Sequence, residues 1–490
     1  MSDRSARGSS STSSPGASAG RLEPDAVGFP TALATAVGLI IASSVLLTAT
    51  TGFGVGGGVF AVAILIAYVL MIFQSMSFSE ASGMMPLAGS VYDYISAGLG
   101  RFLGVTGTLV AYLVVHLFAG TAETAAAGLF ASVNFPFLEG LTPQNSWVIG
   151  VGLLVIFGVI NALGIRVYGA VEVALTVVMW VTLVIFGSLG VLRAATVQTD
   201  GFFGTSLIGT DLTAVLSMVG LAMFLFVGVE FVTPLASELR DPARSIPRAM
   251  FVGLTAVAAS MVLYGVGVLR HVENVELEPG VMMFDTPVPI PIFAEAVLGT
   301  LGRWWLAIAV LFAAAATINT LLAGIPRILY GMAKDRAFPP AFAWLHPRYK
   351  TPWVGIALAM VLPGAHAIWI QGDIDSIIVL ILAAVCAWLF SYILVNISVM
   401  VLRSRRPDLH RPFRTPWFPV PQVLATVGML ITIWYIAPPG IARGDVFLRF
   451  FVMLGLVAVF AVWQTLVMTK KPLFERVEPE ELAREEGQPV

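Results

Sequence analysis

Charged residues are scarce in this chain. Of its 490 residues, 11% are Asp, Glu, Lys or Arg and 58% are hydrophobic, and the mean hydropathy is +0.89. Ordinary soluble domains carry about 25% charged residues, so this chain has too few to cover a globular surface. The net charge of −2 also lacks the basic excess typical of nucleic-acid binding, and we expect no nucleic-acid partner. Lipid is therefore the predicted solvent for most of the chain.

Cysteine and metal-binding motifs are also scarce. The single cysteine, Cys386, excludes an internal disulfide and a metal site built from cysteines. None of the five histidines belongs to an H-E-x-x-H motif, and no nucleophile–base pair typical of an enzyme is present. We expect no cofactor, no metal site and no enzymatic activity. The Ser- and Gly-rich residues 1–28 lack the apolar run of a signal peptide, which predicts a disordered cytoplasmic tail.

Long apolar runs fill the rest of the sequence. A helix needs about 20 apolar residues to cross a bilayer, and twelve such runs predict an all-α integral membrane protein. A transmembrane β-barrel would instead alternate apolar and polar side chains, whereas residues 151–160 are apolar on every side. The predicted spans are 31–52, 58–79, 103–130, 147–165, 169–192, 212–236, 249–269, 304–332, 352–370, 376–402, 417–438 and 446–468.

The distribution of Lys and Arg predicts the orientation of these spans. With the N-terminus inside, 22 of the 27 basic residues fall on the inner segments, which places both termini in the cytoplasm. The inner residues 80–100 are semi-polar and interrupted by Pro86, so we expect them to pack within protein or to line water. The outer residues 271–300 end in a short apolar run, 292–298, which predicts an interfacial helix. Simple connectors remain the alternative for both segments.

Ionisable residues within the spans are candidates for function, because a charge inside a membrane is costly. His116 and Glu123 lie seven residues apart, so on a regular helix they share one face. They either form a polar stripe along a solute path or each bonds to a neighbouring helix. For His366, near the outer end of its span, we favour a role in helix packing over a role in a solute path. Glu172 lies near the inner end of its span, where we expect its side chain to reach the membrane surface.

The predicted helices 31–52 and 212–236 each contain a candidate break. Small and hydroxylated residues follow Gly38 in the first, and Gly228 precedes Glu230 in the second. These helices occupy corresponding positions in two successive five-helix sets, a pattern typical of inverted repeats with a midplane binding site. The predicted substrate-binding residues are Ile41, Ala42, Ser43, Ser44, Phe224, Phe226, Val227 and Gly228, and the predicted proton or amine partners are Glu230, Glu123 and His116.

Four stretches, in order, carry a family resemblance. The first is PLAGSVYDY at 86–94, preceded by Glu80, and the second is FVGVE at 226–230, continuing to ELRDPARSIPR at 238–248. The third is PRILYGMAKDRAFP at 326–339, and the fourth is RPFRTP at 411–416. With these motifs the chain resembles the amino acid–polyamine–organocation permeases over residues 30–420.

This resemblance implies a LeuT-like five-plus-five inverted repeat. The transport core would span 29–403, with repeats at about 29–195 and 205–403, followed by two extra helices at 404–468 and a cytoplasmic tail at 469–490. The basic residues Arg327, Lys334 and the cluster at 403–414 are expected to anchor helix ends to anionic lipid.

The resemblance also implies secondary transport of an amino acid or related amine across the plasma membrane, by alternating access with proton coupling or exchange. The alternatives are a polyamine or organic-cation carrier and, less favoured, a nutrient sensor that does not transport. Where the family's first helix is usually glycine-rich, this chain has Ala42, Ser43 and Ser44, whose Cβ atoms narrow the approach to the backbone. Met179 stands where some proton-coupled relatives carry a lysine. A lysine at this position therefore cannot be the proton-coupling group in this chain.

Overall fold

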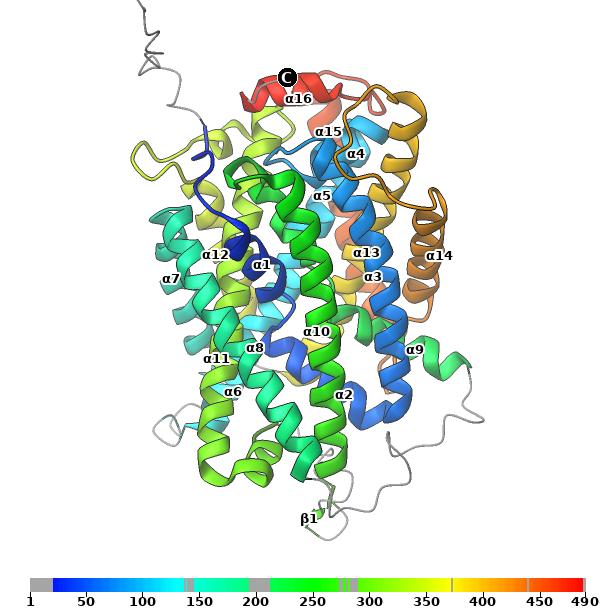
Figure 1. The fold of residues 1–490 in the computed structure, drawn as a ribbon. Helices are drawn as coiled ribbons and strands as arrows, with labels where there is room; N and C mark the ends of the chain where they lie inside the picture. Colours follow the sequence, from blue (N-terminus) through cyan, green and yellow to red (C-terminus); the bar gives the residue numbers. More distant parts are fainter. Residues whose placement is uncertain are drawn as a thin grey trace, which may run out of the picture.

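The computed structural model describes residues 21–135, 138, 145–193, 212–272, 276–278, 281–282, 290–371, 373–438 and 440–487. Within these ranges the chain is almost entirely helical, apart from the short antiparallel pair β1 (Glu276–Glu278) and β2 (Val281–Met282). Its long helices lie side by side in one bundle (Figure 1). The α-helices are α1 (Phe29–Gly38), α2 (Ser43–Gly56), α3 (Gly58–Met84), α4 (Val91–Leu99), α5 (Arg101–Thr108), α6 (Thr121–Asn134), α7 (Trp147–Ala162), α8 (Ile165–Arg193), α9 (Leu212–Phe224), α10 (Pro242–Val272), α11 (Ile290–Lys334), α12 (Trp353–Ile370), α13 (Ile374–Arg405), α14 (Val420–Trp434), α15 (Arg443–Trp463) and α16 (Pro479–Glu486).

Most of these helices are long and apolar enough to cross a membrane. Nine described helical stretches meet that requirement, and the bent pair α1–α2 makes a tenth. Helices α7 and α14 are also apolar but shorter, with 16 and 15 residues. Large apolar side chains project outward, including Val361 on α12 (64% exposed) and Val459 on α15 (70% exposed), and such surfaces require lipid around them. The chain is therefore a multi-pass membrane protein, while the count of twelve spans and the five-plus-five layout remain predictions.

The first predicted span is a broken helix. α1 ends at Gly38, α2 begins at Ser43, and the two helices meet at a bend of 48°. A Cβ on Gly38, at the end of α1, would lie 1.9 Å from the Glu172 Oε1 atom and 2.9 Å from the Thr176 Oγ1 atom of α8. A side chain at this position would therefore have to displace those two side chains of α8, which favours glycine here.

The predicted span 212–236 is broken as well. α9 ends at Phe224, and a 3-10 helix, η6 (Val229–Glu238), follows after Gly228. Gly228 has φ +103°, a left-handed conformation that only glycine adopts at low cost. A Cβ on Gly228 would lie 2.3 Å from the Leu39 side chain, so the two breaks are packed directly against each other.

The predicted span 103–130 is also irregular. Between α5 and α6 the chain winds as two π-helical segments, η1 (Leu109–Val114) and η2 (His116–Gly120). A π-helix has more residues per turn than an α-helix. A spacing of seven residues therefore does not place His116 and Glu123 on one face through this segment. The run 292–298, predicted to be an interfacial helix, forms the first part of α11 ahead of a kink at Gly299.

The C-terminal helix α16 lies across one end of the bundle, beside α4, as Figure 1 shows. Both oxygens of Glu486 accept backbone hydrogen bonds, from Ala88 N and Gly89 N, each at 2.8 Å. Arg406 at the end of α13 forms ion pairs with Glu478 and Glu480, both at 2.6 Å. The segment predicted as the tail 469–490 is thus folded against the bundle up to residue 487. Residues 488–490 lie outside the described residues.

The N-terminal segment forms backbone hydrogen bonds with the C-terminal end of η6. Of the predicted tail 1–28, residues 1–20 lie outside the described residues. Val27 N donates to Glu238 O at 3.2 Å, and Arg240 N donates to Val27 O at 2.9 Å. Ala26 and Val27 are buried, so the chain already packs against the bundle a few residues before α1.

Candidate functional site

Glu123 closes the break between α1 and α2. It projects from α6, and its Oε1 and Oε2 atoms accept hydrogen bonds from Ser43 N at 2.8 Å and Ser44 N at 3.0 Å. All three residues are at most 1% exposed. The first N–H groups of a helix have no partner within the helix and carry its positive dipole end. A carboxylate of the protein therefore occupies the end of α2 that the sequence analysis assigned to a solute.

Glu230 plays a corresponding part at the second break. Its carboxylate accepts hydrogen bonds from Gly228 N at 3.1 Å, from the Tyr392 hydroxyl, and from the Tyr112 hydroxyl at 3.4 Å. Gly228 N also donates to the Tyr392 hydroxyl at 3.1 Å. Each broken helix thus has a buried glutamate bound to the backbone of its break.

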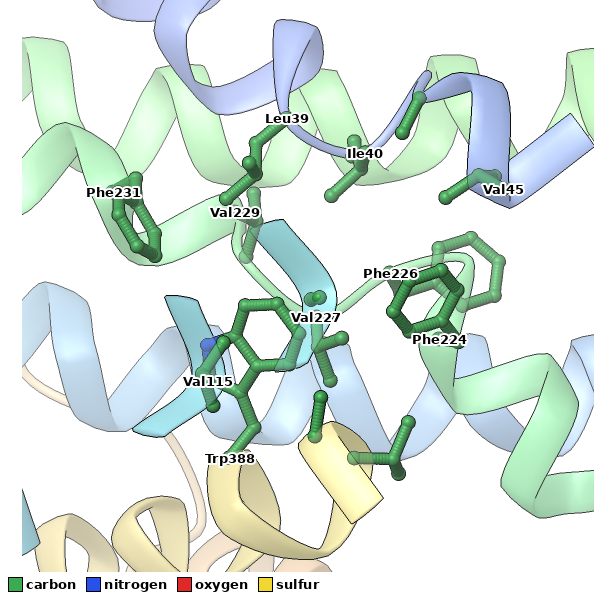
Figure 2. Close-up of a cluster of buried hydrophobic side chains, with 14 of the residues drawn as sticks. Leu39, Ile40, Val45, Val115, Phe224, Phe226, Val227, Val229, Phe231 and Trp388 are labelled. Atoms are coloured by element: carbon green, nitrogen blue, oxygen red, sulfur yellow. The ribbon is translucent and has the colours of Figure 1, made fainter. Parts of the chain in front are cut away.

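A narrow cavity lies between the two breaks. The volume that the centre of a water molecule can occupy inside it is about 10 Å³. This volume holds roughly one water. The cavity is therefore closed to an organic solute in this conformation. Figure 2 shows several of its side chains converging from separate helices. The lining residues are Leu39, Ala42, Ser44, Val45, Ala119, Phe224, Val227, Thr317, Leu321 and Trp388.

Four of the eight predicted substrate-binding residues line this cavity: Ala42, Ser44, Phe224 and Val227. The other four lie around it. Ile41 and Phe226 are buried in the adjoining core, and the ring of Phe226 lies 6.3 Å from that of Tyr68. Ser43 and Gly228 contribute the backbone N–H groups described above.

The cavity wall is mainly apolar but has unused polar groups beside it. Among the described residues, the Ser43 hydroxyl and the Trp388 Nε1 atom have no hydrogen-bond partner, although both are buried. Thr317 donates to Gly38 O at 3.2 Å. The rings of Phe224 and Trp388 lie 6.4 Å apart. Sequence reasoning missed Trp388, because a tryptophan within an apolar span gives no signal that separates a cavity wall from packing.

The two histidines are directed to different helices. His116 Nε2 lies 2.6 Å from Ala359 O of α12, and its Nδ1 has no partner among the described residues. His366 Nδ1 lies 3.1 Å from both the Thr121 hydroxyl and Leu117 O. His366 is a packing residue, as expected. His116 and Glu123 do not share a partner, because η2 turns the helix between them.

The expectation that Glu172 reaches the membrane surface is wrong. Its carboxylate is fully buried and accepts hydrogen bonds from Asn319 Nδ2 at 2.7 Å, Thr320 at 2.9 Å and Thr176 at 3.5 Å. These donors lie on α8 and α11. Only Thr176, four residues along the same helix, offered a signal in the sequence.

The family-like motifs pair with one another at the end of the bundle that carries α16. Glu238 forms a buried ion pair with Arg327. Glu80 binds Arg403 at 2.7 Å and Arg411 at 3.4 Å. The expected lipid anchoring is therefore wrong for Arg327 and Arg411, which are 1% and 8% exposed. Carboxylates remote in sequence provide their counter-charges instead.

Two buried acidic side chains, Glu486 and Asp93, lie where α16 meets α4. Burial raises the pKa of Glu486 to about 7. Burial also raises the pKa of Asp93 well above its ordinary value, and the neighbouring Glu486 carboxylate adds to that shift. In the part of the chain that the structure describes, no group of three or more His, Cys, Asp or Glu side chains could hold a metal ion.

Comparison with known proteins gives a consistent result. The family model for amino acid permeases matches residues 27–460. The branched-chain amino acid permease BcaP of Bacillus subtilis is 24% identical over 452 residues, covering 86% of this chain and 90% of the relative. The serine/threonine exchanger SteT of the same organism is 22% identical, covering 82% and 89%. The human cystine/glutamate transporter is 23% identical, covering 85% and 80%.

Proposed function

The chain belongs to the amino acid permease family, and from that premise we propose that it is a secondary transporter that moves an amino acid or related amine across the plasma membrane by alternating access. As a member of a permease family it is not an enzyme. The observation that best supports the proposal is the buried cavity between two broken helices, each with a glutamate bound at its break. The relatives' names, a branched-chain amino acid permease and a serine/threonine exchanger, favour an amino acid as the starting hypothesis for the substrate.

The proposed layout has twelve spans, with both termini in the cytoplasm. Repeats at about 29–195 and 205–403 form a ten-helix core, and two further helices follow at 404–468. The ten long spans and the shorter apolar helices α7 and α14 support that number. Breaks in the first and sixth spans support the inverted repeat, because they fall at corresponding positions in the two halves.

The proposed transport cycle opens the cavity to one side of the membrane at a time. The first and sixth spans move with their neighbours against the rest of the bundle, and Phe224 covers the solute from one wall. Glu230, Glu123 and His116 are the candidate proton or amine partners. The buried positions of Glu230 and Glu123 at the breaks support this role, because a change in their charge state would alter the hydrogen bonds that hold the breaks.

Reconstitution into liposomes tests this function. We expect the purified protein to catalyse saturable uptake and counterflow of one class among amino acids and amines, above the level of protein-free liposomes. Failure to bind or move any member of the panel would overturn the proposal. Saturable binding without counterflow would instead support the sensor alternative.

Glu230→Gln tests the role of the second break. The amide keeps the size of the side chain but removes its charge and its titration. We expect slower transport with a flatter dependence on pH, measured as initial uptake rates. Unchanged rate and pH dependence would remove Glu230 from the mechanism.

The organic-cation alternative is favoured by one specific observation. Within the described part of the chain, neither Glu123 nor Glu230 forms an ion pair with lysine or arginine. Two carboxylates without a basic partner suit a cationic solute better than an anionic one.

A further inference from the structure

The N-terminus of α2 is already occupied by a carboxylate. Both oxygens of Glu123 are used, one on Ser43 N and one on Ser44 N, and α2 is a 14-residue helix with its positive dipole end at this point. The arrangement is a complete carboxylate site filled by the protein's own side chain.

A solute carboxylate would have to compete for this place. It could displace Glu123 from the two N–H groups, which leaves a buried carboxylate without its donors, or it could lie beside Glu123 as a like charge in a dry environment. Both are costly. Glu230 adds a second carboxylate at the facing break, so a further anion meets repulsion from two directions.

The cavity beside Glu123 suits a cation with an apolar body. Ala42 and Ser44, on either side of Ser43, line the cavity, and the remaining wall includes the rings of Phe224 and Trp388. Aromatic faces attract an ammonium group, and the attraction grows when water is excluded. The free Ser43 hydroxyl supplies a further acceptor for an N–H donor.

We propose that the site selects an organic amine without a carboxylate, and that Glu123 is the specificity-determining residue because it fills the carboxylate position from within the protein. This inference rests on the proposed transport function and narrows its substrate class. The proposed solute is a primary ammonium group on a small apolar alkyl or aryl chain. The cavity must expand to admit it.

Matched pairs that differ only in the carboxylate test the inference on the unmodified protein. Suitable pairs are 3-methylbutylamine with leucine, 2-phenylethylamine with phenylalanine, and 1,4-diaminobutane with ornithine. Each compound is measured by thermal shift of the purified protein and by counterflow in liposomes. We expect the preferred amine to bind at least about 100-fold more tightly than its amino acid, since juxtaposed like charges cost several kcal/mol and 1.4 kcal/mol is tenfold.

The outcomes separate this inference from the transport function. Amino acids that are bound and moved as well as or better than their amines would overturn the inference and leave transport standing. Amines that bind with the expected preference but show no counterflow would support the inference and overturn transport. If no compound binds or moves, both proposals fall.

Substitution of Glu123 gives a second, independent measurement. Glu123→Gln keeps the shape and one acceptor but removes the charge, so we expect amine affinity to fall by about 10- to 100-fold and the preference over the amino acid to narrow by a similar factor. Glu172→Gln is the matched control, because Glu172 is equally buried and lies beside Gly38 at the same break, but its carboxylate accepts hydrogen bonds from Asn319 and Thr320 and not from the first N–H groups of α2. Its amine-to-amino-acid ratio should equal that of the unmodified protein. An unchanged ratio in Glu123→Gln would overturn the assignment of Glu123.

Discussion

Gly228→Ala is the substitution that most directly tests how the two breaks are held together. Gly228 has φ +103°, and a Cβ there would lie 2.3 Å from Leu39 Cδ2 and 2.9 Å from Leu39 Cγ. The left-handed conformation costs a residue other than glycine roughly 1–2 kcal/mol, and overpacking of a filled core costs about 1–3 kcal/mol. The closed conformation should therefore lose about 2–5 kcal/mol.

The matched control is Gly152→Ala in α7, where an added Cβ meets nothing within 4 Å. A helical glycine replaced by alanine gains up to about 1 kcal/mol from helix propensity, so this variant should be neutral or slightly more stable. Thermal midpoints of both variants in detergent, and counterflow rates in liposomes, measure the difference. If Gly228→Ala matched Gly152→Ala in both assays, the claim that the breaks are packed against each other would be refuted.

Two further predictions concern the end of the bundle that carries α16. Burial raises the pKa of Glu486 to about 7 from an ordinary value of 4.5, so docking of α16 is strongest below about pH 4.5 and weakens as the pH rises through about 7. Hydrogen exchange of residues 479–487, corrected for intrinsic rates, should show this loss in the unmodified protein and a smaller loss in Glu486→Gln, where the buried Asp93 still titrates. Arg327→Met leaves Glu238 as a buried charge without a partner and should lower the free energy of unfolding by about 3–5 kcal/mol. Arg327→Met combined with Glu238→Leu should recover most of the lost thermal midpoint. Equal thermal midpoints for the single and the double variant would contradict the pairing.

Hydropathy predicted the long apolar helices, and nine described helical stretches together with the bent pair α1–α2 are long enough to cross a membrane. A bilayer requires such helices whatever their tertiary contacts. Glycine and its small or polar neighbours, rather than hydropathy, located both breaks, since Gly38 and Gly228 mark places where a helix can stop. The C-terminal helix was missed, although Pro479 at its start with Glu480 and Glu481 in its first turn is a recognisable helix beginning.

The partners of the buried charges could not be predicted from local pattern. Glu123 meets Ser43 and Ser44 across 80 and 79 residues, and Glu172 meets Asn319 across 147. Such contacts depend on how the helices pack, which a single sequence does not encode in any local period. The expectation that the two serines face a solute was reasonable for an isolated break, but the residue that fills it comes from another helix.

The closed cavity has a consequence for every affinity measured on this protein. A ligand binds only the fraction of molecules that are open, so the apparent dissociation constant is the intrinsic one divided by that fraction. If about 1% of molecules are open, binding appears roughly 100-fold weaker than the contacts themselves would give. A substitution that loosens the packing far from the cavity will then seem to improve a ligand it never touches. Comparing two ligands on the same variant cancels this factor, whereas comparing one ligand across variants does not.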